Sequence, residues 1–399
     1  MDVLNEKEKM KLEKKQAFWL FGMNTLLVFS LNGGCSDKSA DENPEEGSMK
    51  IPLVFESGLE GYACYRCVAM VVTPQKTILA FCEGRLNDCA DEGDIDLVLK
   101  RSTDGGKTWG SLVTLEDDGA NPCKNPVPVV LPSGRILLMW LWNYSLPSEK
   151  DRTTRDVYLT YSDDDGVTWS ESRNITSEVY LDEWGWYGLG PCHGIVKERE
   201  PHAGRIIMPS RHEENRSHSH ILYSDDNGET WDIGAISPIE GTTESTVVEL
   251  SDGQLMLNCR NDTDYRIVLL SDDGGETFYR NYIYTYLIQP VCQASLLNHS
   301  MNQVTGKSNI LFSNPADREE RVNGTIKLSE DDGKTWTKSY RYSNPYPAFS
   351  GYSDIALLDN GDIAVLFETG PHYTKPLRWE GIGFLTVRFN DINQIISGK

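Results

Sequence analysis

With 399 residues, of which 39% are hydrophobic, the chain is long enough to bury a large core and has an ordinary composition for a soluble protein. Its 60 acidic residues outnumber its 38 lysines and arginines, and the net charge of −22 argues against a nucleic-acid-binding surface. If the ligand is itself an anion, its site must carry a local cluster of arginines against this acidic background.

The first 50 residues do not resemble part of a folded domain. Two adjacent lysines precede an apolar run, residues 18–29, which is too short and interrupted for a membrane span and is typical of a signal peptide. Small residues then precede Cys35, as at a bacterial lipoprotein cleavage site; a plain secretion signal with a chance cysteine is the alternative. We expect a lipoprotein-type signal peptide over residues 1–35 and a flexible acidic tether over residues 36–50. The protein would then be exported, either as a lipoprotein of the bacterial envelope or cell surface or to the periplasm.

The rest of the chain is organised by a repeated octet, first met at Ser102–Trp109. The pattern Ser-x-Asp-x-Gly-x-Thr-aromatic returns at Ser162–Trp169, Ser224–Trp231, Ser271–Phe278 and Ser329–Trp336. Its Asp can accept hydrogen bonds from turn amides, its Gly can take a positive φ, and its Thr and aromatic residue suit a following strand. Each octet is therefore predicted to close a hairpin between two strands of a repeating sheet.

The octet resembles the Asp box of sialidase-type β-propellers, which also occurs in propellers with other activities. This resemblance implies an all-β fold, a six-bladed β-propeller that occupies residues 51–399 as one domain. Six blades of four strands would use about 58 residues each, close to the spacing of the octets. Five octets suffice for six blades if one blade lacks its box and the first blade is split between the termini. The box Asp residues are expected to be structural, so function must come from other residues.

Two arginines mark the first motifs outside the octets. Arg66 begins a buried strand in Tyr-Arg-Cys-Val, and this segment resembles the sialidase motif Tyr/Phe-Arg-Ile-Pro with Cys67 and Val68 in place of Ile and Pro. Pairing of Arg66 with a nearby structural carboxylate is the alternative. Arg85 ends Glu-Gly-Arg after an apolar strand and resembles the second motif block of the same family.

An acidic loop, residues 87–96, follows Arg85. Families of this kind place an acid/base Asp about six residues after the arginine, which selects Asp91. Asp88 and Asp94 are competitors, and a solvated acidic turn is the alternative.

A hairpin in the second half of the chain is the most diagnostic segment. Gly253 turns the strand that follows Glu244 into the strand that precedes Arg260, so both side chains should lie at the open end of the hairpin. Glu249 lies at the other end of its strand and is disfavoured. A surface salt bridge between Glu244 and Arg260 is the alternative.

Three more residues match the family near the carboxyl end. Arg321 precedes Val-Asn-Gly-Thr and resembles the third arginine of the family, with Arg318 as the alternative. Tyr352 lies in Ser-Gly-Tyr-Ser-Asp, which matches the block that carries the catalytic tyrosine, and Glu368 matches the carboxylate that orients the first arginine.

Cysteines and aromatic loops leave alternatives open. Cys64 and Cys67 have zinc-like spacing, but no second pair with metal spacing follows, so a zinc site is not expected. One or two disulfides could form among Cys64, Cys67, Cys82 and Cys89 in an exported protein. The loops at residues 125–127 and 184–191 are typical of sugar sites, although core packing would explain them nearly as well.

Together these segments, in family order, resemble a bacterial exo-α-sialidase of the Asp-box (BNR-repeat) family. The resemblance implies an acid/base, an activating base and a nucleophile, which are Asp91, Glu244 and Tyr352. It also implies five substrate-binding residues: Arg66, Arg85, Arg260, Arg321 and Glu368. No metal or cofactor is expected, the partners would be sialylated glycans or glycoconjugates, and the protein is expected to be a monomer.

This residue set suits the chemistry of sialic acid, whose anomeric carbon carries a carboxylate. Guanidinium groups bind a carboxylate through bidentate charged hydrogen bonds, and a neutral tyrosine avoids the repulsion that an anionic nucleophile would meet there. A tyrosine with an ordinary pKa of about 10 needs a base, and sialidases are a known exception to the two-carboxylate rule of glycosidases. The rival interpretations are a trans-sialidase, a hydrolase for a related nonulosonic acid, a glycan-binding propeller without turnover, and a structural envelope propeller.

Overall fold

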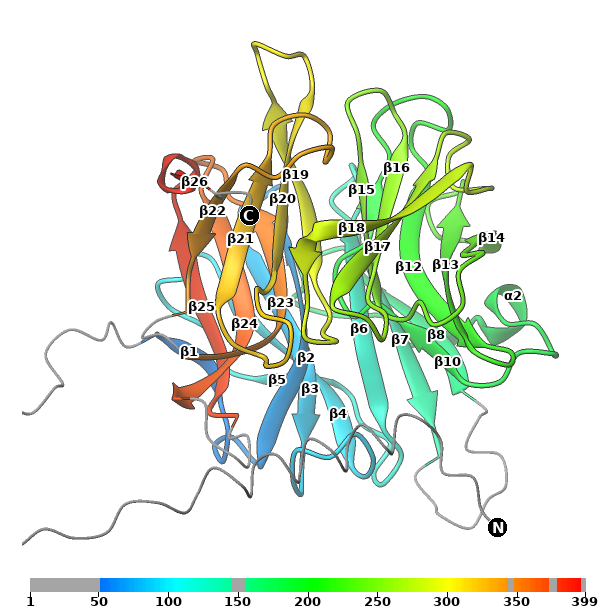
Figure 1. The fold of residues 1–399 in the computed structure, drawn as a ribbon. Helices are drawn as coiled ribbons and strands as arrows, with labels where there is room; N and C mark the ends of the chain where they lie inside the picture. The colour runs from blue at the N-terminus through cyan, green and yellow to red at the C-terminus, as the bar shows by residue number, and fades with distance from the viewer. Residues whose placement is uncertain (1–50, 145–154, 344–347, 373–378, 396–399) are drawn as a thin grey trace, which may run out of the picture. The chain divides into compact units, whose positions relative to one another are not determined.

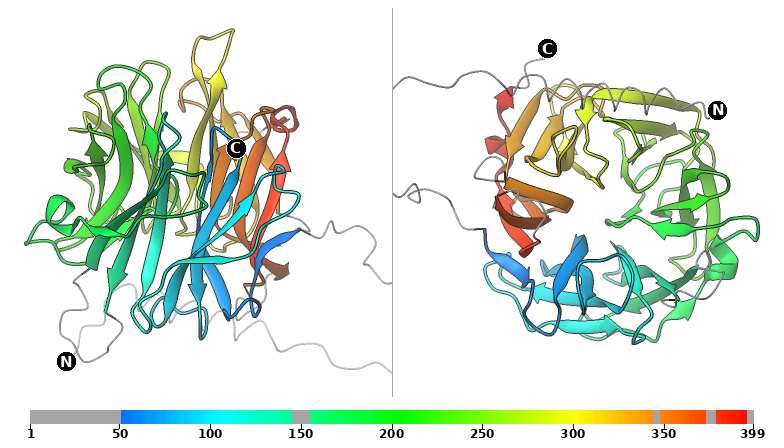
Figure 2. Two further views of the ribbon diagram at one scale, coloured as in Figure 1. Left: turned by 180° about the vertical axis from the view of Figure 1, so that it is seen from behind. Right: turned by 60° about the horizontal axis from the view of Figure 1, so that its bottom comes forward.

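The computed structural model describes residues 51–144, 155–343, 348–372 and 379–395. The expected signal peptide, the tether and Cys35 lie outside these residues. Within the described ranges the chain forms six antiparallel sheets placed around a central axis, and Figures 1 and 2 show them as the blades of a β-propeller. Among the described helices, none is both long and apolar enough to cross a membrane.

Each blade has four main strands that follow one another from the central axis to the outside. Blade 1 contains β2 (Cys64–Val72), β3 (Ile78–Arg85), β4 (Ile95–Ser102) and β5 (Val113–Glu116). Blade 2 contains β6 (Cys123–Val130), β7 (Ile136–Asn143), β8 (Arg155–Ser162) and β9 (Arg173–Asn174). Blade 3 contains β10 (Tyr187–Leu189), β12 (Ile206–Glu213), β13 (Ser217–Ser224) and β14 (Asp232–Ile236), with the short β11 (Ile195–Val196) beside β12.

The remaining blades repeat this order. Blade 4 contains β15 (Ser245–Glu249), β16 (Leu255–Cys259), β17 (Tyr265–Ser271) and β18 (Arg280–Ile288). Blade 5 contains β19 (Ser295–Met301), β20 (Ser308–Pro315), β21 (Gly324–Ser329) and β22 (Lys338–Arg341), with β26 (Gln394–Ile395) on its outer side. Blade 6 contains β23 (Ala348–Leu357), β24 (Ile363–His372), β25 (Gly381–Val387) and β1 (Leu53–Glu56). Two short helices, α2 (Thr176–Val179) and η1 (Phe389–Asp391), complete the described elements.

Blade 6 closes the ring with strands from both ends of the chain. Its outermost strand, β1, pairs with β25 in antiparallel register, with Phe55 opposite Ile382. One blade is split between the termini as expected, but it is the last blade and not the first, because β2–β5 form a complete sheet. This also explains why five octets serve six blades, because the third and fourth strands of blade 6 are not joined by a hairpin.

All five octets occupy the turn between the third and fourth strands of their blades. In the first, the Asp104 carboxylate accepts hydrogen bonds from the Ser102 hydroxyl (2.8 Å), the Thr108 hydroxyl (2.7 Å) and the Thr108 amide (2.9 Å). The other four repeat these contacts. Gly106 has a φ of 84°, and an added Cβ would lie 2.0 Å from the Phe384 ring. Glycine is thus required there by backbone conformation and by space.

In the first two octets the final tryptophan packs on the preceding blade. The Trp109 ring meets Phe384 of blade 6 at 5.2 Å, and the Trp169 ring meets Phe81 of blade 1 at 5.8 Å, both edge to face. Such contacts bury apolar area between neighbouring sheets, which is the main stabilising term of the core.

The register of blade 1 separates two ends of the propeller. Arg66 pairs with Glu83 at one end of the blade, whereas Ile78 pairs with Ser102, the start of the first octet, at the other end. The octets therefore lie at the end of the blades opposite to the end that carries Arg66 and Arg85.

Candidate active site

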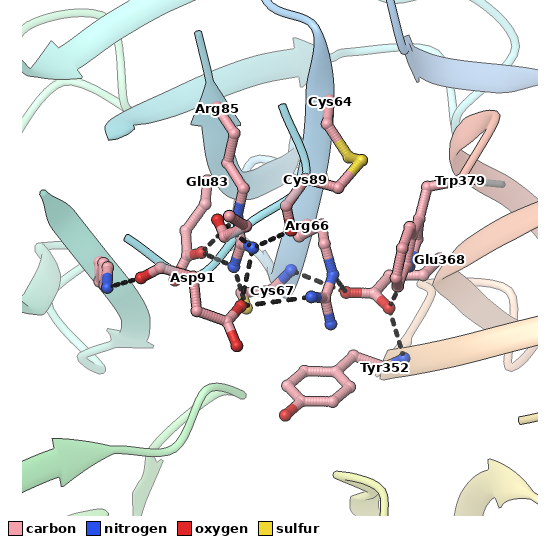
Figure 3. Close-up of polar contacts among 12 residues, drawn as sticks. Cys64, Arg66, Cys67, Glu83, Arg85, Cys89, Asp91, Tyr352, Glu368 and Trp379 are labelled. Atoms are coloured by element: carbon pink, nitrogen blue, oxygen red, sulfur yellow. Dashed lines mark hydrogen bonds and ion pairs between the residues drawn. A yellow bond between two sulfur atoms is a disulfide. The ribbon is translucent and has the colours of Figure 1, made fainter. Parts of the chain in front are cut away.

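Arg66 and Glu368 form a buried ion pair between the first and last blades (Figure 3). The Arg66 Nε donates to Glu368 Oε1 at 3.2 Å, and the guanidinium lies 4.5 Å from the centre of the Trp379 ring. Glu368 also accepts hydrogen bonds from the backbone amides of Cys67 (3.0 Å) and Tyr352 (3.3 Å) and from Trp379 Nε1 (3.2 Å). Burial opposes the ionisation of Glu368, but the charges of Arg66 and Arg321 together with its hydrogen bonds outweigh burial, so the pKa is lowered. This carboxylate holds Arg66 in place, as the family resemblance implied.

Two backbone features make room for this pair. Cys67 has a φ of 58°, and the strand register shifts between Arg66 and Ala69, which breaks the regular alternation at the start of β2. At Gly351, an added Cβ would lie 2.1 Å from Glu368 Oε2, so glycine is needed for the close approach of β23 and β24.

Arg85 is buried beneath the loop between β3 and β4. Its Nη2 and Nε donate to Glu83 Oε2 at 2.6 and 3.2 Å. Its Nη1 donates to the carbonyls of Cys89 and Ala90 and to Asp91 Oδ1, each at 2.7 Å. One guanidinium therefore fixes both the backbone and a carboxylate of the acidic loop.

The Asp91 side chain lies over two arginines yet remains 76% exposed. Its Oδ1 is 2.7 Å from Arg85 Nη1 and 3.3 Å from Arg66 Nη1. Partial burial opposes ionisation, but the charges of Arg85 and Arg66 lower the pKa of Asp91. Among the contacts of the described residues, neither competitor reaches these arginines. Asp88 accepts a hydrogen bond from the Ala90 amide at 2.7 Å, and the pKa of Asp94 is raised by burial and by the charge of Asp117.

Glu244, Arg260 and Tyr352 form a second hydrogen-bonded group. Glu244 directly precedes β15 and Arg260 directly follows β16, and the Arg260 amide donates to the Glu244 carbonyl at 2.8 Å. The expected placement of both residues at one end of the hairpin is confirmed. Arg260 Nη1 donates to Glu244 Oε2 at 2.5 Å and to the Tyr352 hydroxyl at 2.9 Å, while this hydroxyl donates to Glu244 Oε1. Glu249 lies at the opposite end of β15 and pairs with Lys197 at 2.8 Å.

The charges in this group shift the pKa values of Glu244 and Tyr352 in opposite directions. Burial opposes the ionisation of Glu244, but the charges of Arg260 and Arg211 lower its pKa to about 2. Burial, together with the charge of Glu244, raises the pKa of Tyr352 well above its ordinary value. At neutral pH the site thus holds a neutral phenol that donates to a carboxylate.

Arg321 completes a ring of three guanidinium groups around Tyr352. Its guanidinium lies 5.3 Å from the centre of the Tyr352 ring, that of Arg66 lies at 5.7 Å, and Arg260 donates to the hydroxyl. The Arg321 carbonyl accepts from the Ser350 amide at 2.9 Å, which ties this arginine to the strand of Tyr352. Arg318, the alternative, instead lies 5.0 Å from the Tyr265 ring.

All eight residues selected from the sequence thus gather at one end of the propeller, but their surroundings include residues that the sequence analysis missed. Glu83 holds Arg85, Trp379 covers Arg66, and the Lys124 ammonium donates to the Asp91 carbonyl. The available signal for Glu83 was its position directly after the apolar residues 78–82, where a charged side chain in a buried strand needs a partner. Arg211, whose guanidinium lies 4.0 Å from the Trp186 ring, had no local signal.

In the aromatic loop at residues 184–191, one tryptophan packs in the core and another lies beside two arginines. Trp184 is buried and stacks on His212 with ring centres 3.7 Å apart, which is core packing. Trp186 is only partly buried and lies beside the guanidinium groups of Arg155 (4.3 Å) and Arg211 (4.0 Å). Residues 125–127 were expected in a loop but lie within β6, where the backbone amide of Asn125 donates to Glu83 Oε1 at 3.1 Å.

One disulfide joins Cys64 and Cys89, which settles the pairing left open by the sequence. Among the described residues the other cysteines are free and buried, including Cys67 and Cys82. The disulfide links the first residue of β2 to the loop that carries Asp91 (Figure 3).

Known proteins share this fold and about a third of the aligned sequence. The BNR repeat-like domain family matches residues 76–365. A sialidase of Micromonospora viridifaciens is 31% identical over 355 residues, which cover 82% of this chain and 53% of the relative, so the chain spans about half of that relative's length. A sialidase of Paraclostridium sordellii is 33% identical over 344 residues, which cover 76% of this chain and 81% of the relative. Among solved structures, the Hadza microbial sialidase Hz136 is 29% identical with a TM-score of 0.74, over 85% of this chain and 68% of that chain. The chain therefore belongs to the sialidase family of BNR-repeat proteins.

Proposed function

We propose that this protein is an exo-α-sialidase, a glycoside hydrolase that releases terminal sialic acid from glycoconjugates with retention of configuration. The observation that carries the proposal is the convergence of three guanidinium groups on a tyrosine whose hydroxyl donates to a carboxylate. A carboxylate-bearing anomeric carbon is the substrate feature that this arrangement fits.

Arg66, Arg260 and Arg321 bind the sialic acid carboxylate in this mechanism. Three guanidinium groups repel one another, and the buried Glu368 beside Arg66 offsets part of that repulsion. Arg85, which lies next to Asp91, is assigned to the hydroxyl at the 4-position of the sugar, as the family resemblance implies.

Tyr352 attacks the anomeric carbon while its proton passes to Glu244. The pKa of Glu244 is lowered to about 2 because Arg260 and Arg211 outweigh the effect of burial. A substrate carboxylate on Arg260 counters part of that charge, so the pKa of Glu244 rises and the carboxylate becomes a better base for the tyrosine. The bond that forms joins Tyr352 Oη to the anomeric carbon, and the bond that breaks frees the leaving oxygen.

Asp91 supplies the proton that the leaving oxygen needs. Arg85 and Arg66 lower the pKa of Asp91 against the effect of burial, and a substrate carboxylate bound to Arg66 raises this pKa again. In the second step the ionised Asp91 takes a proton from water, which attacks the anomeric carbon and releases Tyr352. Two inversions give net retention.

The test compares the wild-type protein with Tyr352→Phe on the 4-methylumbelliferyl glycoside of N-acetylneuraminic acid. We expect release by the wild type and a roughly thousandfold lower kcat in the variant, because the nucleophile is removed. Tyr187→Phe is the matched control, since the Tyr187 hydroxyl lies 3.1 Å from His220 Nε2, outside the site. Proton NMR of the first product formed would show the α-anomer.

Other results would redirect the proposal in defined ways. Normal turnover in Tyr352→Phe would contradict the assigned nucleophile. Transfer of sialic acid to added lactose would identify a trans-sialidase. If neither protein releases the fluorophore, a related nonulosonic acid or a binding propeller without turnover becomes the better assignment.

We also propose that the protein is a monomer anchored to the bacterial envelope through a lipid on Cys35. The support is the order of lysines, apolar run, small residues and cysteine in residues 14–35. Cys35→Ser should move the protein from the membrane fraction to the soluble fraction of the producing cells, and an unchanged distribution would contradict the anchor.

A further inference from the structure

The loop that carries Asp91 has little packing of its own. Residues 86–94 are exposed or only partly buried, and Leu86 at the start of the loop is 43% exposed. The loop closes on itself through the Leu86 amide, which donates to the Asp94 carbonyl at 3.1 Å. No apolar side chain of this loop is buried in the core of the described residues, so its position depends on polar contacts and on one covalent bond.

The polar contacts come from basic residues beneath the loop. Arg85 Nη1 donates to two loop carbonyls and to Asp91, Arg66 pairs with Asp91 at 3.3 Å, and Lys124 donates to the Asp91 carbonyl. The covalent bond is the disulfide between Cys89, two residues before Asp91, and Cys64, two residues before Arg66. Cys64 is fully buried and pairs with Arg85 in the sheet, so the loop is bonded to the frame that holds the arginines.

This step rests on the proposed function. With substrate bound and Asp91 protonated, the polar contacts to the Asp91 side chain become weaker. A substrate carboxylate competes with Asp91 for Arg66. When Asp91 is protonated as the general acid, it loses the charge that binds it to both Arg66 and Arg85. The disulfide is unaffected by either event.

We propose that the Cys64–Cys89 disulfide positions Asp91 for proton transfer, and that it is required for substrates with basic leaving groups but not for activated ones. A sugar alkoxide must be protonated as it leaves, whereas 4-nitrophenolate is a weak base and leaves without a proton. A displacement of Asp91 by about 1 Å is enough to lower the rate of the first kind of reaction by roughly a hundredfold. Cys64 and Cys89 are thus positioning residues that act through Asp91.

The experiment compares Cys64→Ser/Cys89→Ser with the wild type on two substrates, 3′-sialyllactose and the 4-nitrophenyl glycoside of N-acetylneuraminic acid. We expect kcat/KM to fall by about tenfold or more on sialyllactose and to change by less than about threefold on the nitrophenyl glycoside. Binding of 2,3-dehydro-N-acetylneuraminic acid, measured by calorimetry, should be retained because the three arginines are untouched. Cys192→Ser is the matched control, since it replaces a buried free thiol whose Sγ lies 3.4 Å from the Ser245 carbonyl.

Equal losses on both substrates, or no loss on either, would overturn the inference, as would a mass spectrum of the wild type with free thiols at both positions. Wild-type protein inactive on both substrates would instead contradict the proposed function, so the two failures are distinguishable. If the double variant does not fold, the same ratio is measured on folded wild type before and after reduction. Dithiothreitol is then oxidised to its cyclic disulfide as the two cysteines gain two electrons and two protons, and the same outcomes apply.

Discussion

The two ends of the propeller use carboxylates in opposite ways. At the octet end, Asp104 accepts its hydrogen bonds from Ser102 and Thr108, all within one turn. At the site end, Glu368 binds Arg66 and Glu244 binds Tyr352, across sequence separations of 302 and 108 residues. The first kind of contact is local and recurs in five blades, whereas the second exists only because the ring brings different blades together. The repeated octets therefore indicate the fold, whereas the contacts between residues far apart in the sequence indicate the site.

The comparison also shows that a lowered pKa does not by itself mark a catalytic group. Hydrogen bonds from Thr108 lower the pKa of Asp104 to about 2, and this carboxylate is an exposed part of a turn. Arginine charges lower the pKa of Glu244 to about 2 as well, but against the opposing effect of burial. The two residues differ in the cause of the pKa shift: hydrogen bonds within one turn for Asp104, and arginine charges acting against burial for Glu244.

The largest effect should follow from removing a long-range contact at the site end. Arg260→Ala takes away the guanidinium shared by Glu244 and Tyr352, and we expect kcat/KM on the methylumbelliferyl substrate to fall by roughly a thousandfold. The pKa of Glu244 should rise from about 2 towards its ordinary range, because the charge of Arg260 is the largest of the effects that lower this pKa against burial. The base is active only when ionised, so the acid limb of the residual pH profile should move to higher pH.

Arg318→Ala is the matched control for the loss of one arginine near the site. Arg318→Ala removes a nearby arginine that lies against Tyr265, and it should leave kcat/KM within about twofold of the wild type. A kcat/KM of Arg260→Ala within tenfold of the wild type would contradict the view that the long-range contacts at the site end carry the chemistry.

A smaller effect should follow from removing a local contact at the octet end. Asp226→Ala deletes the acceptor of the Ser224 hydroxyl, the Thr230 hydroxyl and the Thr230 amide in blade 3. We expect the melting temperature to fall by about 2 °C, while kcat/KM stays within about twofold, because the turn lies at the end opposite to the site. Thermal unfolding and steady-state kinetics on the same preparation measure both. Loss of activity without loss of stability would show that the octet end takes part in the chemistry.

The same distinction explains what could be predicted from the sequence. The octets were readable because each Asp, Gly and Thr acts within eight residues, and they indicated the six-bladed propeller that the structure confirms. The Glu244–Arg260 contact was also readable, because a hairpin with its turn at Gly253 brings the two residues together. Motif resemblance supplied the remaining site positions, which the structure gathers at one end.

Residues that act across blades without a motif could not be found in this way. Trp379 covers Arg66 from the far end of the chain, and Arg211 acts on Glu244 from another blade, and neither position has a local pattern that indicates it. The partner of Cys64 was open among several cysteines, because the choice depends on how the acidic loop folds back over β2.

The closure of the ring by β1 has a consequence for the order in which the protein matures during synthesis. Arg66 comes from the first blade, and its partner Glu368 comes from the last blade, beside Tyr352. A nascent chain that ends before residue 368 lacks this partner, and a chain without β25 has no strand on which β1 can pair. The arginine cluster is therefore completed only after the strands of the last blade, through β25, have left the ribosome. Chains that end before Glu368 therefore cannot form the Arg66–Glu368 ion pair that holds the first arginine of the site.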